Sequence, residues 1–370
     1  MKVNELRLRN FRNYGKVDVQ FSDGVNVLIG ENAQGKTNLL EAIYVLALTK
    51  SHRANSNRDL INWDDKAADI WGLVQRGSGK TQLELTLSSK GKRAKVNHIE
   101  QAKLSTYIGQ LNVILFAPED LKIVKGSPQI RRRFMDIEFG QMSNKYLYNM
   151  TQYRRILKQR NAYLRQLHFH KATDTIYLDV LSDQLAAYAA EIIYQRVQLL
   201  GKLQKWSQKI HSAISQQRET LNFKYMTSLK KGELGSVEQI YQILLEKFKR
   251  NHEKEIRQGT SIFGPHRDDL RFIVNGKDVA QFGSQGQQRT AALATKLAEI
   301  DVMKEETREY PVLLLDDVLS ELDEGRQTHL LTAIQDKVQT FLTTTSMSDV
   351  ATELIHNPKM FHIKDGIISK

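Results

Sequence analysis

The stretch Gly30-Glu31-Asn32-Ala33-Gln34-Gly35-Lys36-Thr37 fits the phosphate-loop pattern GxxxxGK[ST]. The apolar run before it, Val25 to Ile29, predicts a buried strand, and the apolar positions of residues 36–48 predict a packed helix. In this arrangement backbone N–H groups surround phosphates, Lys36 neutralises the β- and γ-phosphates, and the Thr37 hydroxyl binds Mg²⁺. The alternative is a glycine turn that precedes a helix by chance, and the flanking strand and helix argue against it.

A second element of such a site lies near the C-terminus. Val312-Leu313-Leu314-Leu315-Asp316-Asp317 predicts a buried strand that ends in two carboxylates. We expect Asp316 to hold Mg²⁺ and Asp317 to polarise the attacking water. The run by itself equally describes a strand that ends in a polar turn, and only its pairing with the phosphate loop (P-loop) favours a nucleotide site. One folded head must then be built from both chain ends, with a large insertion between them.

The insertion has its own composition. From about residue 127 to residue 215 helix formers dominate, with one proline and few glycines. Two apolar patterns in this region predict two long helices packed against each other as an arm. We therefore expect an α/β protein whose head, a mixed sheet with helices, comprises residues 1–116 and 280–370. A mainly helical arm is expected at residues 117–279.

Composition sets limits on the class of protein. A length of 370 residues suggests roughly two to three domains. The net charge of +12 fits a polyanionic partner, although a basic surface kept soluble by repulsion accounts for it equally well. The absence of cysteine excludes disulfides and a thiol nucleophile. No apolar run approaches the ~20 residues that cross a bilayer, and the N-terminus lacks an apolar signal core, so a soluble, cytoplasmic protein without a membrane partner is expected.

A third motif decides the class of P-loop protein. Residues 282–289, Phe-Gly-Ser-Gln-Gly-Gln-Gln-Arg, directly precede a predicted helix at 285–304. Ser284, Gln285, Gly286 and Gln287 resemble the signature motif (usually LSGGQ) of ABC-type ATPases, whereas a Ser/Gly helix cap is the alternative. Residues 320–323, Ser-Glu-Leu-Asp, resemble the D-loop (usually SALD) of the same class, with Asp323 as its carboxylate. The resemblance implies ATP and Mg²⁺ as cofactors. It also implies that the signature of one subunit caps the γ-phosphate on the P-loop of a second subunit.

Further stretches narrow the resemblance. They are residues 8–14 (Leu-Arg-Asn-Phe-Arg-Asn-Tyr), 49–53 (Thr-Lys-Ser-His-Arg), 116–121 (Phe-Ala-Pro-Glu-Asp-Leu), 125–128 (Lys-Gly-Ser-Pro), 131–136 (Arg-Arg-Arg-Phe-Met-Asp) and 263–270 (Phe-Gly-Pro-His-Arg-Asp-Asp-Leu). Together with the signature they resemble the RecF family of bacterial recombination mediators, in the SMC/RecF branch of ABC-type heads, from residue 1 to about residue 355.

This resemblance implies an ATP-dependent homodimer that binds double-stranded DNA at gaps or stalled forks. Such a protein acts with RecR and RecO to promote loading of the recombinase RecA, and its slow, DNA-stimulated ATP hydrolysis works as a switch. Arg12 and Asn13 fall where related heads contact the nucleotide.

The chain also departs from the ABC-type pattern. Asp317 stands where Glu is usual, and a shorter carboxylate reaches the water less easily, so slow hydrolysis is expected. Residues 343–346, Thr-Thr-Thr-Ser, replace the switch histidine. Glu119 is a candidate for the missing Q-loop glutamine, and Gln285 replaces the first glycine of LSGGQ.

Other clusters have two interpretations. Arg131 to Arg133 could grip phosphates, but we expect a solvated face or pairing with nearby acids. His266, Asp268 and Asp269 could mimic a metal site, but a hydrogen-bonded β-turn is favoured. The tryptophans are expected in the core or in packing contacts rather than as stacking platforms: Trp63, Trp71 and Trp206.

Three other functions compete with the DNA-binding switch. The large helical insertion and the basic charge argue against the energising subunit of a membrane transporter or another ABC-type machine. A nuclease of the overcoming-lysogenisation type carries an added metal domain, and only about fifty residues follow Asp317, the bottom of the domain size range. A small-molecule kinase would lack the Ser284 signature and the loop at residues 320–323.

Overall fold

The structure, a computed structural model, describes residues 1–335, 337–346 and 357–369, except for the side chain of Glu321. The expected head segment 280–370 and the RecF-like region to about 355 therefore include positions outside the described residues. Within the described part of the chain, no helix is both long and apolar enough to cross a membrane.

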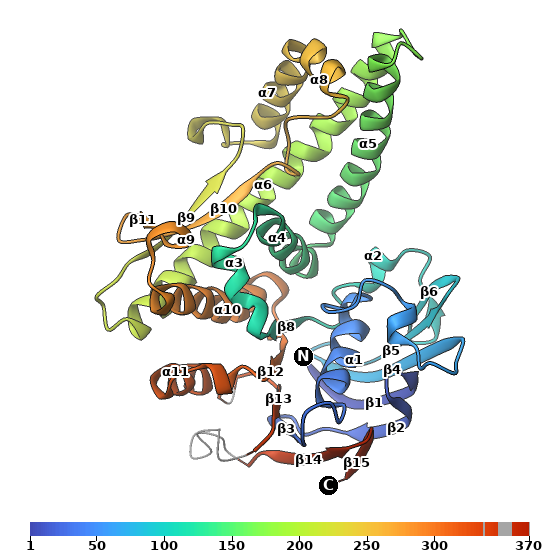
Figure 1. The fold of residues 1–370 in the computed structure, drawn as a ribbon, viewed down its shortest axis with the longest axis vertical. Coiled ribbons are helices and arrows are strands. Elements are labelled where there is room, and N and C mark those ends of the chain that lie inside the picture. Colours follow the sequence, from blue (N-terminus) through green and yellow to red (C-terminus); the bar gives the residue numbers. More distant parts are fainter. Residues whose placement is uncertain (336, 347–356, 370) are drawn as a thin grey trace. The chain divides into compact units, whose positions relative to one another are not determined.

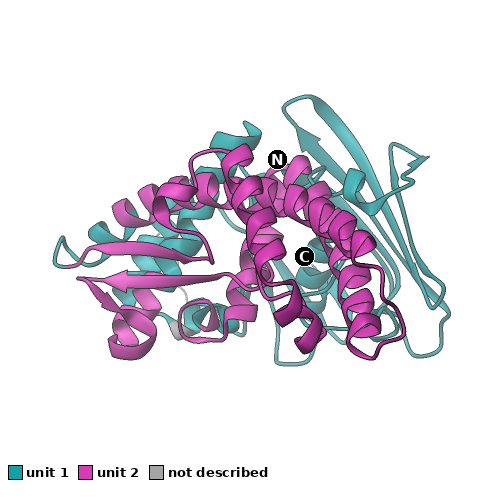
Figure 2. Ribbon diagram, turned by 90° about the horizontal axis from the view of Figure 1, so that it is seen from above, with its two compact units in different colours: residues 1–121, 210–218, 292–370 teal, residues 122–209, 219–291 magenta. Residues whose placement is uncertain are grey.

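The chain divides into two compact units, coloured separately in Figure 2. Unit 1 comprises residues 1–121, 210–218 and 292–370, and unit 2 comprises residues 122–209 and 219–291. Unit 1 thus joins both chain ends, as the positions of the P-loop and the Asp316 strand predict.

The unit limits at residues 121 and 291 differ from the expected domain limits at 116 and 279. The larger difference has a local cause. Helix α9 (Val279–Phe282) contacts strand β10 (Asp269–Val274), and Gln287 Nε2 donates to Glu219 Oε1 over 2.7 Å. These contacts keep the segment before residue 292, including the signature, within unit 2.

Unit 1 contains two six-stranded sheets in its described part. The antiparallel sheet has the order β2-β1-β4-β5-β6-β7: β1 (Lys2–Phe11), β2 (Tyr14–Gln20), β4 (Ala67–Arg76), β5 (Gly79–Ser88), β6 (Gly91–Val96) and β7 (Ile99–Glu100). The second sheet is mostly parallel, with the order β15-β14-β3-β13-β12-β8: β3 (Val25–Ile29), β8 (Val113–Phe116), β12 (Val312–Asp316), β13 (Thr340–Thr344), β14 (Lys359–Lys364) and β15 (Ile367–Ser369). The buried strands predicted before the P-loop and before Asp317, β3 and β12, are confirmed.

Helix α1 (Lys36–Leu48) packs between these two sheets (Figure 1). It contacts β12 and β13 on one side and β1 and β4 on the other, and nearly all of its residues are buried. A helix that is apolar all round is the type expected for such a buried position. Among its described residues, unit 1 also contains α2 (Leu104–Tyr107), α11 (Glu324–Ile334), most of α10 (Gln285–Thr307) and the end of α6 (Thr175–Ile214).

The two chain ends are joined by buried polar contacts. Gln339 is 1% exposed. Its side-chain oxygen accepts from the N–H of Val3 over 2.6 Å, and its amide donates to the carbonyls of Val3 and Ser22 over 2.8 and 2.7 Å. The terminal amino group of Met1 donates to the carbonyl of Tyr310 over 2.6 Å. Because buried polar groups are costly when unpaired, these contacts link the N-terminal strand firmly to the C-terminal half.

The register of the parallel strands decides which residues meet at the edge of the sheet. Strand β13 pairs with β3, with Ile29 beside Thr344, and also with β12, with Asp316 beside Thr343. The carboxyl ends of all three strands therefore lie at one edge, where ligands bind in open α/β sheets. The P-loop and Asp316 leave the sheet at this edge.

Unit 2 is mainly helical, as predicted for the arm. Its helices are α4 (Pro128–Met142), α5 (Asn144–His168), α7 (Val237–Arg250), α8 (His252–Gln258), α9, most of α3 (Leu121–Lys125) and most of α6 (Thr175–Ile214). The two long helices are confirmed as a packed pair, because Leu164 and Leu167 of α5 cluster with Leu178 of α6. A small antiparallel sheet with the order β11-β10-β9 accompanies them: β9 (Leu221–Met226), β10 and β11 (Lys277–Asp278).

A fully buried ion pair connects four helices of unit 2. Arg160 of α5 and Glu255 of α8 lie 2.6 Å apart, and neither side chain is exposed. The guanidinium also donates to Ser182 of α6 over 3.0 Å and lies over the ring of Phe248 of α7 at 4.6 Å. A buried charge of this kind is tolerated only with a full set of partners.

Two clusters of unit 2 that had two interpretations in the sequence form ordinary ion pairs and hydrogen bonds. Arg131 is buried and pairs with Asp269 at 2.6 Å, so the prediction that this run pairs with nearby acids is confirmed for Arg131. The N–H of Arg267 donates to the carbonyl of Gly264 over 2.9 Å, which is the predicted β-turn. His266 Nδ1 shares a hydrogen bond of 2.5 Å with the Tyr153 hydroxyl, and burial lowers the pKa of His266 to about 4.

The prediction for the tryptophans is partly wrong. Trp71 and Trp206 are half-buried, and Trp71 packs under the guanidinium of Arg7 at 4.3 Å. Trp63, in contrast, is 89% exposed. The sequence around Trp63 is polar and irregular, so periodicity carries no information on its side-chain direction.

The buried pair in unit 2 leads to a first prediction. Glu255→Gln should lower the free energy of unfolding of unit 2 by about 3–5 kcal/mol, because it leaves the Arg160 guanidinium buried without its counter-ion. The measurement is urea unfolding followed by Trp206 fluorescence in a variant whose other two tryptophans are phenylalanine.

The matched control is Glu246→Gln, which breaks the exposed pair of Glu246 with Arg250 and should change stability by less than about 0.5 kcal/mol. Equal effects of the two substitutions would contradict the structural role of the buried pair.

Candidate functional site

The P-loop follows a path that its glycines make possible. Gly35 has a φ of 119°, and a Cβ added there would lie 2.8 Å from Asn13 Nδ2 and 2.9 Å from the Tyr14 hydroxyl. A Cβ at Gly30 would clash with the carbonyl oxygen of Ile363. Both positions thus need glycine, one for backbone freedom and close approach and the other for close approach alone.

Turns from both chain ends brace this loop. The Gln34 side-chain oxygen accepts from the N–H of Asp365 over 2.7 Å, and the Gln34 carbonyl accepts from the N–H of Gly366 over 3.1 Å. Asn13 donates to the same carbonyl over 3.2 Å. The β1–β2 turn and the β14–β15 turn therefore hold the loop in place.

Lys36 is positioned within the loop. Its Nζ donates to the carbonyls of Glu31, over 2.9 Å, and Gly30. Burial lowers the pKa of Lys36, and the nearby carboxylates of Asp317 and Asp316 partly offset this. A cation supported by backbone carbonyls at the mouth of the loop can approach the phosphates of a bound nucleotide.

Asp316 is the centre of a small oxygen cluster. Its Oδ1 accepts from the Thr37 hydroxyl over 2.9 Å and from the Thr343 hydroxyl over 3.0 Å. The Thr343 hydroxyl in turn accepts from the N–H of Asp317 over 2.9 Å. Asp317 has a φ of 53°, an uncommon conformation for a residue other than glycine. The sequence left open which hydroxyl stands at the histidine position, and Thr343 is the one that contacts both aspartates.

This cluster fits Mg²⁺. Thr37 and Asp316 supply hard oxygen ligands within 3 Å of each other. Mg²⁺ is usually held by one or two carboxylates together with substrate phosphates and water, so a single acidic residue beside a P-loop hydroxyl is sufficient. Among the described residues there is no larger cluster of acidic or histidine side chains that suggests another metal site.

Arg12 is held at the pocket by a buried acid. Its Nε and Nη2 donate to both oxygens of Glu41 over 2.8 and 2.9 Å, and Glu41 is fully buried. Burial disfavours the Glu41 carboxylate, but the hydrogen bonds from Arg12 and Ser51 outweigh burial, and the pKa of Glu41 is lowered. Glu41 therefore stays ionised and fixes the direction of the guanidinium.

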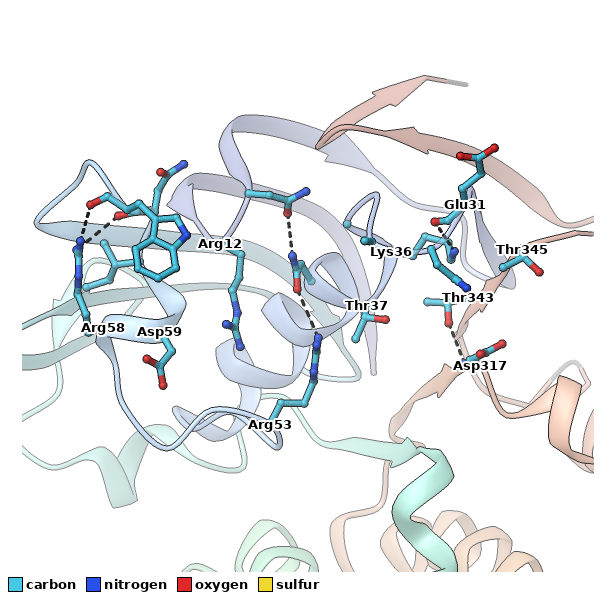
Figure 3. A pocket seen from close by; sticks show the side chains of 18 residues that line it. Arg12, Glu31, Lys36, Thr37, Arg53, Arg58, Asp59, Asp317, Thr343 and Thr345 are labelled. Atoms are coloured by element: carbon cyan, nitrogen blue, oxygen red, sulfur yellow. Dashed lines mark hydrogen bonds between the residues drawn. The ribbon is translucent and has the colours of Figure 1, made fainter.

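These elements surround one cavity of about 720 Å³ in unit 1, shown in Figure 3. That volume lies within the usual range for small-molecule sites. Its lining includes Arg12, Asn13, Glu31, Asn32, Ala33, Gly35, Lys36, Thr37, Asn38, Arg53, Arg58, Asp59, Ile61, Asn62, Trp63, Asp317, Thr343 and Thr345. Most of the residues predicted to contact the nucleotide thus line one pocket, while Asp316 is buried behind Thr37.

Two predicted elements have local structural roles. Ser284 and Gln287 form a reciprocal cap at the start of α10: the Ser284 N–H donates to Gln287 Oε1 over 2.9 Å, and the Gln287 N–H donates to Ser284 Oγ over 3.2 Å. Ser284 and Gln285 are nevertheless exposed. Asp323 caps α11 by accepting from the N–H of Arg326 over 2.9 Å. Their roles in a second subunit stay predictions.

The sequence analysis did not predict that several residues lining the cavity could contact a ligand. Arg58 lies outside the motifs quoted above, and the role of Thr343 depends on strand register. Only the Thr-Lys-Ser-His-Arg stretch could have indicated Arg53. Glu119, the candidate for the Q-loop, is exposed and does not line this cavity.

The family model and the most similar curated proteins point to the same family. The family described as "RecF/RecN/SMC N terminal domain" matches residues 2–369. A protein of Pediococcus pentosaceus named "DNA replication and repair protein RecF" is 63% identical over 368 residues, which cover 100% of this chain and 98% of that protein. A protein of Latilactobacillus sakei with the same name is 62% identical, over 100% and 98% of the two chains.

Comparison with solved structures points to the same family as the sequence comparison. The chain superimposes on "the recombination mediator protein RecF-ATP in RecFOR pathway" with a TM-score of 0.91, 34% identity, and coverage of 100% of this chain and 97% of that one. An Smc head domain from Pyrococcus furiosus matches with a TM-score of 0.56 and 16% identity, over 99% and 95% of the chains, which shows the shared fold alone. The expected ABC-type head fold with an inserted arm is confirmed.

The Arg12–Glu41 pair leads to a second prediction. Glu41→Gln should lower the free energy of unfolding by roughly 2 kcal/mol at pH 7, because hydrogen bonds between charged groups are lost. Since folding lowers the pKa of Glu41, its stabilisation is fully present above the ordinary Glu pKa of about 4.3 and is lost as the pH falls through the lower folded-state value. Urea unfolding at pH 7 and at acidic pH measures the difference between the two proteins.

Glu100→Gln is the control, because Glu100 forms an exposed pair with Arg93 and should have little effect at either pH. A difference between the native protein and Glu41→Gln that does not shrink in acid would contradict the assignment.

Proposed function

Because this chain belongs to the RecF family, we propose that it is a DNA repair ATPase that dimerises on ATP and binds double-stranded DNA. The observation that carries the proposal is the register of β3, β13 and β12, which brings the P-loop, Asp316 and Asp317 to one edge of the sheet. A relative whose structure is described as RecF-ATP shares the fold over the full chain.

The nucleotide would bind with its phosphates in the P-loop. The loop N–H groups and the N-terminus of α1 would face the phosphates. Lys36 would exchange its hydrogen bonds with the carbonyls of Glu31 and Gly30 for hydrogen bonds with the phosphates, and Arg12 would add a second cation. Thr37 and Asp316 would hold Mg²⁺, which supplies charge neutralisation between the β- and γ-phosphates when bound.

Asp317 would position the water that attacks the γ-phosphorus. The bond from the γ-phosphorus to the bridging oxygen breaks, and ADP and inorganic phosphate leave. The hydrogen bond from the Asp317 N–H to Thr343 fixes the backbone at this residue, and the Ser320 hydroxyl donates to Asp317 Oδ1 over 3.2 Å, which orients the carboxylate. Asp is shorter than the Glu usual in this class and reaches the water less well, which fits slow hydrolysis and a role as a switch.

The signature would complete the site of a second copy. Ser284 and Gln285 are exposed at the start of α10, and Phe282, two positions before Ser284, is an exposed aromatic residue. A polar helix N-terminus beside an exposed apolar side chain suits an interface with a bound anion. ATP would then hold two copies together through Ser284, Gln285, Gly286 and Gln287, and hydrolysis would release them.

The net charge and the family support the proposed binding of DNA and of partner proteins. The net charge of +12 suits a phosphate backbone. The RecFOR pathway, named for the structural relatives, supports RecR and RecO as partners of this chain. We propose RecA loading in the cytoplasm as the outcome. Family membership favours this function over the energising subunit of another ABC-type machine.

The test of this proposal is the molecular mass in solution, with and without ATP, repeated with a short DNA duplex. ATP should shift the mass from monomer to dimer, and the duplex should stabilise the dimer. A protein that stays monomeric under all conditions would contradict the switch.

A mixing experiment asks whether the signature acts in trans. Lys36→Arg and Ser284→Arg should each remain monomeric with ATP, although Ser284→Arg still binds ATP. In an equimolar mixture, the P-loop of the Ser284→Arg chain can meet the intact signature of the Lys36→Arg chain, so dimers should partly return. A mixture no different from its components, or full dimerisation of Ser284→Arg alone, would exclude action in trans.

Asp317→Asn provides a further prediction. Phosphate release should fall at least about tenfold, because a neutral amide replaces the negatively charged carboxylate that polarises the water, and the ATP-bound dimer should persist longer. Asp23→Asn is the matched control, since Asp23 is an exposed acid of unit 1 that pairs with Lys2 and does not line the cavity. Unchanged turnover in Asp317→Asn would exclude Asp317 as the residue that orients the water.

A further inference from the structure

Trp63 occupies an unusual position for a large apolar side chain. It is 89% exposed, yet it lines the same cavity as Lys36 and Thr37. Single exposed apolar residues are common on protein surfaces, so exposure alone carries no meaning. Its location at a ligand-sized cavity is what calls for a physical explanation.

The backbone that carries Trp63 is firmly held. The guanidinium of Arg58 donates to the carbonyls of Trp63 and Asp65, each over 2.5 Å. The N–H of Asn62 donates to the carbonyl of Asn10 over 2.8 Å, and Ile61 forms a β-bridge with Phe11. The indole therefore projects from a loop fastened to the end of β1, rather than from a free loop.

The cavity changes chemically along its length. Figure 3 shows Lys36, Asp317 and Thr345 at one end, Arg58 and Asp59 at the other, and Arg12 and Arg53 between them. Because Arg58 binds the Trp63 carbonyl, the indole belongs to the end remote from the P-loop. A nucleoside triphosphate with its phosphates at Lys36 would extend its sugar and base toward this end.

We propose that the Trp63 indole stacks on the nucleobase of the bound nucleotide and is the main determinant of affinity for the base. The inference rests on the proposed function, since it needs the phosphates in the P-loop. Aromatic side chains stack on bases because both present flat, polarisable faces. Burial of the exposed indole under a base would also remove its apolar surface from water.

The test separates base binding from phosphate binding. Dissociation constants for ATP and for inorganic tripolyphosphate, both with Mg²⁺, are measured for the native protein, Trp63→Ala and Trp63→Phe. Trp63→Ala should weaken ATP binding roughly 5- to 100-fold and leave tripolyphosphate binding unchanged, while Trp63→Phe keeps part of the difference. Phe169→Ala, which removes a 64% exposed aromatic residue of unit 2, should change neither constant.

Fluorescence gives an independent measurement. In a Trp71→Phe, Trp206→Phe variant, Trp63 is the remaining tryptophan. ATP should quench its emission, whereas tripolyphosphate should not.

The outcomes are distinguishable. A native protein that binds neither ligand would overturn the nucleotide site and with it the proposed function. A native protein that binds both, with an ATP to tripolyphosphate ratio unaltered by Trp63→Ala, would overturn the stacking role of Trp63 and leave the P-loop assignment standing.

Discussion

The parallel pairing of β3, β13 and β12 is the constraint on which the nucleotide pocket depends. Strand β3 delivers the P-loop and β12 delivers Asp316, although the two strands come from opposite ends of the chain. Strand β13 lies between them and contributes Thr343, which contacts Asp316 and the backbone of Asp317. Before the start of the same strand, Gln339 is hydrogen-bonded to Val3 and Ser22. A slip of one residue in this register would turn the Thr343 side chain to the other face and separate these groups.

Charge around the pocket is arranged by partners that lie behind it. Glu41 is buried and ionised, so it can hold the Arg12 guanidinium at the cavity without competing for the ligand. Lys36 is supported by backbone carbonyls, and burial makes its charge costly until an anion is near. The pocket is thus preorganised for a polyanion, and the positive φ values of Gly35 and Asp317 are part of that arrangement.

Unit 2 uses buried charge for a different purpose. Arg160 and Glu255 join helices through a pair that has no access to water, and the buried Arg196 donates to the buried Tyr146 hydroxyl and to Asp136, which is partly exposed. Such groups require every partner at once, which restricts how the helices can pack. The cap at Ser284 contrasts with this interior: its hydrogen bonds satisfy the helix start, while the Ser284 side chain stays exposed.

The sequence by itself determined the P-loop, the strand that ends in Asp316, the helix that follows the loop and the presence of a helical arm, because these depend on local spacing and periodicity. It also indicated the RecF-like character through motifs of fixed composition. Only the tertiary structure decided that Glu41 holds Arg12, that Thr343 contacts both aspartates and that Trp63 lies at the cavity. These contacts join residues far apart in the chain or lie on irregular loops, where side-chain direction is set by strand register and turns rather than by any repeating pattern.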